Sequence, residues 1–285
     1  MKPLLLCGLL CLPTAIPAQS LRLDAAITFN VDDLRFGGFS SLEVSADGLT
    51  FMSTSDRGTL LRGEILRENG RMVGVANLRL TDILDTKGVP LSSYHEDAEG
   101  LAVSPSGEIF MSFEANHRIM RQTSVDSLPE FVPKHPEFRT LINNSGLEAL
   151  AIDDAGVLYT IPERSGELGR PFPVYRYIDG VWDRSWSIPR EDDFLVSGAD
   201  IFAGQLYVLD RDLAGLRGFT SRIRRFDIGA STGETLITTS PGRFDNLEGI
   251  ALWQPDGGPP RIVLISDDNF LFLQKTQLVE MVLEP

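Results

Sequence analysis

Short apolar segments alternate with glycine-containing turns along most of the chain, and five of these segments resemble one another. They begin about 50 to 60 residues apart, and each mixes small residues with aliphatic ones. The five are SSLEV at Ser40, EGLAV at Glu99, EALAI at Glu148, SGADI at Ser197 and EGIAL at Glu248. Recurrence at this period indicates a repeat architecture in which each repeat is one supersecondary unit.

Each segment continues into a turn and a second apolar segment, which is the pattern of a β-hairpin. In the second repeat, EGLAV is followed by SPSG and then by EIFMSFE. Further strand pairs follow, with turns predicted at Asn69-Gly70 and Asp179-Gly180. Four antiparallel strands in a repeat of this length are typical of a β-propeller blade.

The chain is therefore predicted to be an all-β protein, a β-propeller of four-stranded antiparallel blades in a single domain over residues 19–285. Five blades are counted, although the segments 59–96 and 119–144 are long enough to hold a degenerate sixth. The last repeat lacks an outer strand of its own. We expect residues 21–29 to supply it, so that N- and C-terminal strands close the ring within one blade.

The first 18 residues predict a cleavable signal peptide, because Lys2 precedes a short apolar run and a small-residue cleavage site ends at Ala18. That run is too short to span a bilayer as a helix, and no other segment comes close. We therefore expect an exported protein, periplasmic or secreted, without a membrane span. Since both cysteines lie within residues 1–18, the mature chain is predicted to have no disulfide and no thiolate metal site.

The net charge is −14, from 40 acidic and 26 basic residues. No cluster of Lys and Arg resembles a nucleic-acid-binding surface, and this much negative charge favours cations such as Ca²⁺ as partners. Solubility outside the cell explains the charge equally well unless the acidic residues cluster in space. We expect a monomer that does not bind nucleic acid.

The acidic residues occupy similar places in successive repeats. Glu99 lies about six residues before its turn and Glu114 about seven after it, so a hairpin brings both to the same end of a blade. If the repeated segments are the innermost strands, these residues converge on one mouth of the central channel. The expected inner set is Glu99, Glu148 and Glu248, and the expected outer set is Asp56, Glu114, Glu163, Asp210 and Asp267. Hard oxygen ligands without cysteine and with few histidines predict that this ring binds Ca²⁺.

Arginines accompany the outer acidic residues. Arg57, Arg164 and Arg211 each directly follow one, and Arg118 comes four residues after Glu114 with His117 beside it. Because arginine binds phosphate and carboxylate groups through two parallel hydrogen bonds, we expect these residues to bind a small anionic substrate. The alternative is that they form salt bridges between blades and keep the acidic mouth from repelling itself.

At these residues the chain resembles the phytase-like domain family, often described as "esterase-like activity of phytase". The similar segments are GGFSSLEVSADGLTFMSTSDRG from Gly37, DAEGLAV from Asp97, GLEALAI from Gly146, FDNLEGIAL from Phe244 and VLISDDNF ending at Phe270. The resemblance implies an exported β-propeller and a Ca²⁺-dependent hydrolase of phosphoric esters. The chain departs from a strongly phytate-binding channel, because Ser40 and Ser197 replace inner glutamates and lysine is scarce.

Three functions are consistent with these features. The first is a Ca²⁺-dependent hydrolase of phosphate esters or related anionic esters, with Glu99 or Glu148 as the general base. The second is a Ca²⁺-dependent lactonase or carboxylesterase with His117 as the proton relay. The third is a non-enzymatic periplasmic propeller that binds a ligand or serves as a scaffold. The sequence contains no serine-nucleophile elbow, P-loop, HExxH motif or dinucleotide fingerprint.

Overall fold

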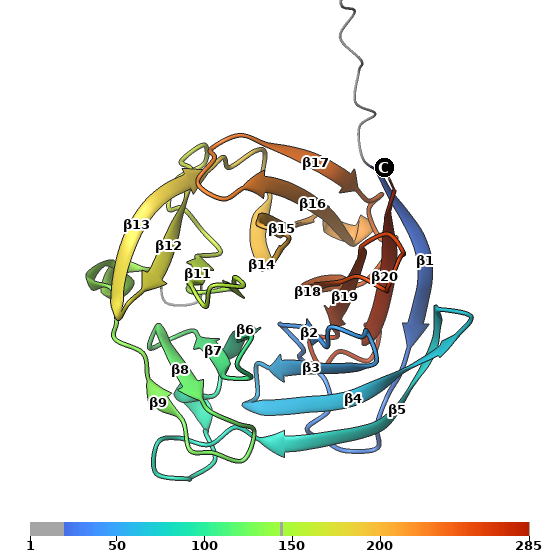
Figure 1. Ribbon diagram of the computed structural model, residues 1–285, viewed down its shortest axis with the longest axis horizontal. Coiled ribbons are helices and arrows are strands. Elements are labelled where there is room, and N and C mark those ends of the chain that lie inside the picture. The colour runs from blue at the N-terminus through green and yellow to red at the C-terminus, as the bar shows by residue number, and fades with distance from the viewer. Residues whose placement is uncertain (1–19, 143–144, 285) are drawn as a thin grey trace, which may run out of the picture.

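The computed structural model describes residues 20–142 and 145–284, which form a five-bladed β-propeller (Figure 1). Each blade is a four-stranded antiparallel sheet, and the first strand of the blade lies nearest the central axis. The predicted fold class and the count of five blades are therefore confirmed. The signal peptide expected at residues 1–18 lies outside the described residues.

Blades 1 to 4 follow one another along the chain. Blade 1 contains β2 (Glu43–Val44), β3 (Thr50–Ser55), β4 (Thr59–Glu68) and β5 (Arg71–Asp82). Blade 2 contains β6 (Ala98–Val103), β7 (Ile109–Phe113), β8 (Arg118–Gln122) and β9 (Glu130–Phe131). Blade 3 contains β10 (Ala149–Ile152), β11 (Leu158–Ile161), β12 (Phe172–Ile178) and β13 (Val181–Ile188). Blade 4 contains β14 (Leu195–Phe202), β15 (Gln205–Leu213), β16 (Phe219–Asp227) and β17 (Gly233–Thr238).

Blade 5 closes the ring with both ends of the chain. It contains β18 (Asn246–Trp253), β19 (Arg261–Asp267) and β20 (Gln277–Glu284), and its outer strand is β1 (Ser20–Thr28). β1 and β20 pair antiparallel from Ser20↔Glu284 to Thr28↔Gln277. The expected closure by the N-terminal strand is confirmed, and it leaves no gap between the last blade and the first.

The short elements between strands follow from local backbone preferences. Asn69 and Gly70 have φ of 51° and 78°, and Asp179 and Gly180 have φ of 51° and 82°. Two consecutive positive φ values fit the two-residue hairpin turn whose twist matches that of the strands. Within residues 20–142 and 145–284, three 3₁₀ helices lie in longer connections: η1 (Ser93–His95), η2 (Pro136–Thr140) and η3 (Gly215–Arg217). Among the residues described, no helix has the length and apolar character that crossing a bilayer requires.

The hydrophobic cores lie between neighbouring blades and hold them in a ring. Phe51 and Leu61 of blade 1, for example, are buried in one cluster with Val263 and Leu278 of blade 5. Each blade therefore buries its faces against two neighbours, as a sheet with two apolar faces must.

Small residues allow the innermost strands to approach closely around the axis. A Cβ atom on Gly198 of β14 would lie 2.4 Å from the carbonyl oxygen of Glu248, and one on Gly249 of β18 would lie 2.5 Å from the carbonyl carbon of Ser41. A cavity of about 10 Å³ remains between the inner strands, which is roughly the room that one water molecule needs. At this level of the channel there is no room for a ligand larger than a water molecule.

Candidate functional site

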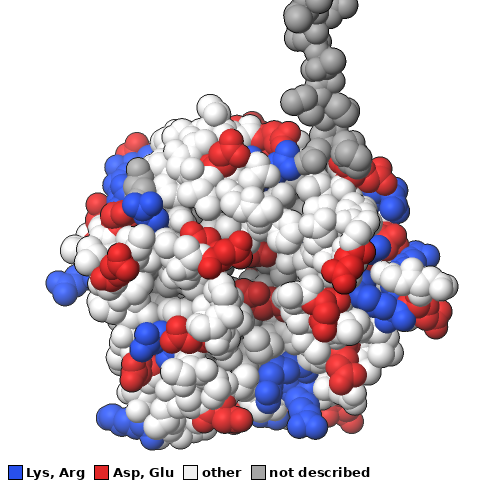
Figure 2. All heavy atoms as spheres, viewed as in Figure 1, with Lys and Arg blue, Asp and Glu red and all other residues white. Residues whose placement is uncertain are grey.

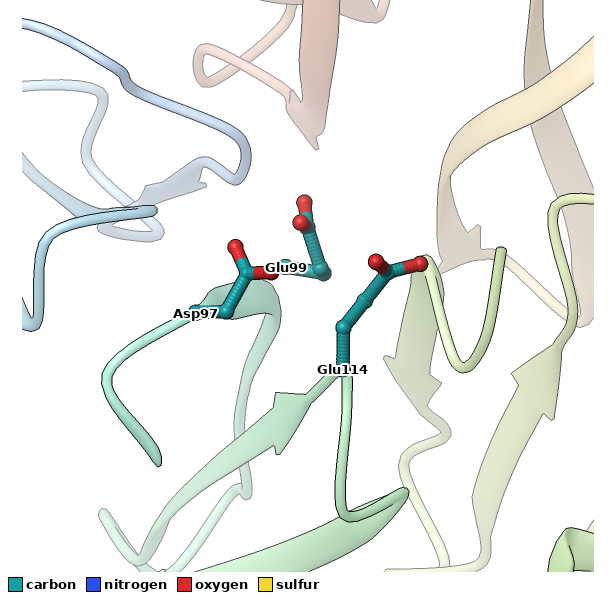
Figure 3. Close-up of side chains that lie close together, drawn as sticks. All are labelled: Asp97, Glu99 and Glu114. Atoms are coloured by element: carbon teal, nitrogen blue, oxygen red, sulfur yellow. The ribbon is translucent and has the colours of Figure 1, made fainter. Parts of the chain in front are cut away.

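Three carboxylates of blade 2 meet at one mouth of the channel (Figure 3). The side chains of Asp97, Glu99 and Glu114 each offer an oxygen, and these oxygens lie within 4.8 Å of one another. Asp97 immediately precedes β6 and Glu114 immediately follows β7, and the Glu114 N–H donates to the Asp97 carbonyl at 2.9 Å. The hairpin thus brings Glu99 and Glu114 to the same end of the blade, as expected, together with Asp97, which was not among the predicted ligands.

A β-bulge directs the Glu99 side chain toward the axis. The pairing passes from Ala98↔Phe113 to Gly100↔Ser112, which leaves Glu99 without a partner in β7. The same irregularity occurs around Ser197 in β14 and around Glu248 in β18. Bulges redirect a side chain out of the normal alternation of a strand, so the bulge recurs with the repeat and places its first residue at the mouth.

Most of the other predicted acidic residues surround this group. Glu148, Glu163, Glu248 and Asp267 are buried, and Asp56 is partly buried. In the space-filling view, acidic side chains gather around the hollow at the centre of the ring (Figure 2).

Burial and mutual repulsion make these carboxyl groups hard to ionise. Burial, and then the neighbouring carboxylates, raise the pKa of Glu99 and of Glu148 well above the ordinary value. Burial is also the main cause that raises the pKa of Glu114 to about 7 and that of Asp267 to about 8. A cation at the mouth would relieve this repulsion.

Asp210 does not belong to this ring. It is fully buried in blade 4, where it accepts hydrogen bonds from Arg222 Nε at 3.0 Å and from Arg224 Nε at 2.6 Å. Val196 and Leu247 each come directly before the bulge residue of their strand, and they pair with Asp210 and Ser266. The next residues along the partner strands, Arg211 and Asp267, therefore correspond to each other. The sequence alignment was therefore wrong by one residue in this repeat, and one residue in a strand moves a side chain to the opposite face.

Arg211 places a positive charge where other blades have a carboxylate. Its guanidinium donates to Glu248, to Asn246 Oδ1 at 3.1 Å and to Glu163 Oε1 at 3.3 Å. Burial opposes the charged form, but Glu248, Glu148 and Glu163 outweigh it and raise the Arg211 pKa. One side of the ring is thus neutralised by the protein itself.

The other residues predicted to bind substrate lie in different surroundings. Arg57 is exposed and its guanidinium lies 3.3 Å from the centre of the Phe270 ring. Arg118 is buried, donates to the His95 carbonyl at 2.5 Å and lies over the Phe113 ring.

His117 is buried and packs against the Gly146 backbone. A Cβ on Gly146 would lie 2.1 Å from His117 Nδ1, and that nitrogen has no hydrogen-bond partner among residues 20–142 and 145–284. His117 also lines a separate hollow of about 220 Å³ together with Lys134 and Arg139. It is not part of the acidic group, although the Gly146 N–H donates to Glu114 Oε1 at 2.6 Å.

Arg164 connects the ring to a larger cavity on blade 3. Its Nε donates to Glu163 Oε2 at 3.1 Å, and the cavity of about 290 Å³ beside it is also lined by Arg170, Arg184 and Tyr175. Arg184 is paired with Glu137, which lines the same cavity. Arg170 and Arg184 were not predicted from the sequence, since neither follows a ring carboxylate.

The blade 2 carboxylates could hold a metal ion. Two oxygens that ligate one Ca²⁺ at 2.3–2.6 Å lie at most about 5 Å apart, and the 4.8 Å limit within Asp97, Glu99 and Glu114 meets this condition. The group contains oxygen donors alone, which suits a hard cation better than zinc or copper.

Comparisons with solved structures show the propeller fold. The chain is similar to the PQQ-bound aldose sugar dehydrogenase from Streptomyces coelicolor, with 15% identity, a TM-score of 0.51, and coverage of 94% of this chain and 99% of that chain. A putative gluconolactonase gives 11% identity and a TM-score of 0.48, with 94% of each chain covered. At 15% identity, the similarity to the dehydrogenase is evidence of the fold alone.

Sequence comparisons identify the family. No curated protein gives a significant match. The phytase-like family, described as "Esterase-like activity of phytase", matches residues 34–270, which include blades 1 to 4, strands β18 and β19 of blade 5 and all the acidic residues of the mouth. The chain therefore belongs to the phytase-like family.

Proposed function

We propose that the protein is an exported, Ca²⁺-dependent hydrolase of phosphate esters or related anionic esters that acts at the acidic mouth. The observation that carries the proposal is the convergence of Asp97, Glu99 and Glu114 within 4.8 Å in a chain of the phytase-like family. Because the cavity between the inner strands has only about the room of one water molecule, the substrate would bind at the open face.

In this proposal the blade 2 carboxylates hold the cation and a neighbouring carboxylate moves the proton. A bound Ca²⁺ would neutralise charge on the ester oxygens and make an adjacent water more acidic. Glu148 lies outside the group but is hydrogen-bonded to Glu114. Burial, and then the charge of Glu163, raise its pKa above the ordinary value, and it is the proposed base that accepts a proton from the attacking water.

The cavity on blade 3 would receive an anionic part of the substrate. Arg164 lies at its edge beside Glu163, so the cavity adjoins the ring. Arg170 forms no ion pair with any of the described residues, and its guanidinium is therefore available to an incoming phosphate or carboxylate.

The lactonase alternative receives less support. His117, its proposed proton relay, packs against Gly146 and lines another hollow. A non-enzymatic propeller would still use the same cation site, so turnover must be measured directly.

The test is hydrolysis of p-nitrophenyl phosphate, a lactone and a carboxylic ester by the mature protein, with Ca²⁺ and with EGTA. Phosphate ester hydrolysis is expected with Ca²⁺, with loss of at least 100-fold in EGTA and in Glu148→Gln. Glu64→Gln, at an exposed position, is the matched control. Lactone hydrolysis without phosphatase activity would select the second function, and Ca²⁺ binding without any turnover would select the third.

A further inference from the structure

We infer that Arg211 takes the place of a second metal ion, so that the ring binds one divalent cation instead of two. The inference rests on the proposed function, because it concerns the same ring of carboxylates. It is carried by a comparison of blade 2 with blade 5, which present corresponding residues to the mouth.

Blade 5 repeats the blade 2 site position by position. Glu248 is the bulge residue of β18, as Glu99 is of β6. Asn246 lies two residues before it, where blade 2 has Asp97, and Asp267 ends β19 at the place of Glu114.

The blade 5 side chains are also close together. Asn246 Nδ2 donates to Glu248 Oε1 at 2.7 Å and lies 3.4 Å from Asp267 Oδ2. Two carboxylates and an amide oxygen form an oxygen donor set of the kind that Ca²⁺ accepts.

The two sites differ in what the preceding blade contributes. Blade 1 contributes Asp56 next to blade 2, and the nearby Asp97 helps to raise the Asp56 pKa to about 7 after the larger effect of burial. Blade 4 contributes Arg211 next to blade 5. The first site therefore gains a further carboxylate, whereas the second gains a cation.

Arg211 engages the oxygens that a second ion would need. One of its terminal nitrogens donates both to Glu248 Oε1 and to Asn246 Oδ1, and the other donates to Glu163 Oε1. The arginine side chain is 22% exposed and is held between two blades. Arginine stays charged at any physiological pH, so proton loss cannot vacate the position for a metal.

The experiment is the Ca²⁺ stoichiometry of the mature protein, measured by equilibrium dialysis with metal analysis. We expect one Ca²⁺ in the wild type and two in Arg211→Asp, which restores the carboxylate found in the other four blades. Arg164→Gln is the matched control, because Arg164 also binds Glu163 but from the exposed rim, and it should keep one. Arg211→Gln should also bind a second Ca²⁺, more weakly than Arg211→Asp. It replaces Arg211→Asp as the test if that variant does not fold.

Each outcome separates this inference from the proposed function. Two ions in the wild type, or one ion in both folded Arg211 variants, would overturn the role of Arg211 and leave the hydrolase proposal standing. No ion in the wild type but one in Arg211→Asp would support the role of Arg211 and overturn Ca²⁺-dependent hydrolysis. No ion in any of them would overturn both.

Discussion

Asp210 and Arg211 are adjacent in β15, and their side chains serve opposite sides of blade 4. Asp210 binds Arg222 and Arg224 inside the blade, whereas Arg211 reaches Glu248 across the boundary with blade 5. The alternation of a β-strand produces this division. Asp210 therefore stabilises the blade, whereas Arg211 contributes its charge to the mouth.

Asp210→Ala should therefore destabilise the protein without removing the metal site. The substitution leaves the buried guanidiniums of Arg222 and Arg224 without their shared counterion, and breaking such a buried pair costs about 3–5 kcal/mol. Urea unfolding measures the free energy of unfolding. The control is Asp154→Ala at an exposed position, and its free energy of unfolding should lie within about 0.5 kcal/mol of that of the wild type. If the Asp210→Ala protein is as stable as the wild type but no longer binds Ca²⁺, Asp210 is a metal ligand at the mouth and this assignment is wrong.

Without metal, the protein should lose stability as the pH rises. The raised pKa values of Glu114, about 7, and Asp267, about 8, mean that the folded state favours the protonated carboxyl groups. Their contribution is present in full below about pH 4 and is lost as the pH rises through 7 to 8. Ca²⁺ would bind the ionised form of Glu114, so it should oppose this loss of stability.

The melting temperature in EGTA is accordingly expected to be lower at pH 8 than at pH 5.5, and Ca²⁺ should raise it more at pH 8. The magnesium salt at the same ionic strength controls for screening. An equal effect of Ca²⁺ at both pH values would show that Glu114 is not one of its ligands.

A second acidic pair lies further along the inner strands. Blades 1 and 4, which have Ser40 and Ser197 at the bulge position, carry Glu43 and Asp200 three residues later, where the other blades have alanine. Glu43 Oε1 accepts the Val103 N–H at 2.9 Å. Burial, and then the charge of Asp200, raise the Glu43 pKa well above its usual range, and burial raises the Asp200 pKa to about 7.

Glu43→Gln should stabilise the protein at alkaline pH. The amide oxygen keeps the bond to Val103, and the repulsion of ionised Asp200 is removed. Since a raised pKa gives stability that is present in full near pH 4 and is lost as the pH rises, the variant should match wild type at pH 4. At pH 8 it should exceed wild type by on the order of 1 kcal/mol or more. Urea unfolding at both pH values is the measurement, and a variant no more stable than wild type at pH 8 would contradict the coupling.

The fold could be read from the sequence because it depends on repetition. The five repeated segments, their turns and the apolar segments after them recur at one period, and this period is typical of a propeller blade. Closure by β1 followed from the missing strand of the last repeat.

The site was harder to predict from the sequence, because it depends on the register in which the strands pair. The turn of the blade 4 hairpin, between Phe202 and Gln205, is shorter than that of blade 2, between Val103 and Ile109, so counting residues selected Asp210 where the structure places Arg211. Asp97 lies two residues before Glu99, outside the five residues that recur in each repeat. Its signal was present in the sequence, since Asp97 and Asn246 both stand two residues before an inner glutamate. The cavity of Arg170 and Arg184 depends on the packing of distant segments, which no local pattern reports.

The most direct test of the account is the anomalous diffraction of crystals grown with a lanthanide in place of Ca²⁺. We predict one strong peak at the mouth, bound by Asp97, Glu99 and Glu114, and its loss in Asp97→Asn crystals. The Asp154→Asn protein should keep the peak. A map without a peak at these three carboxylates, or with its main peak between Glu163 and Glu248, would contradict the account.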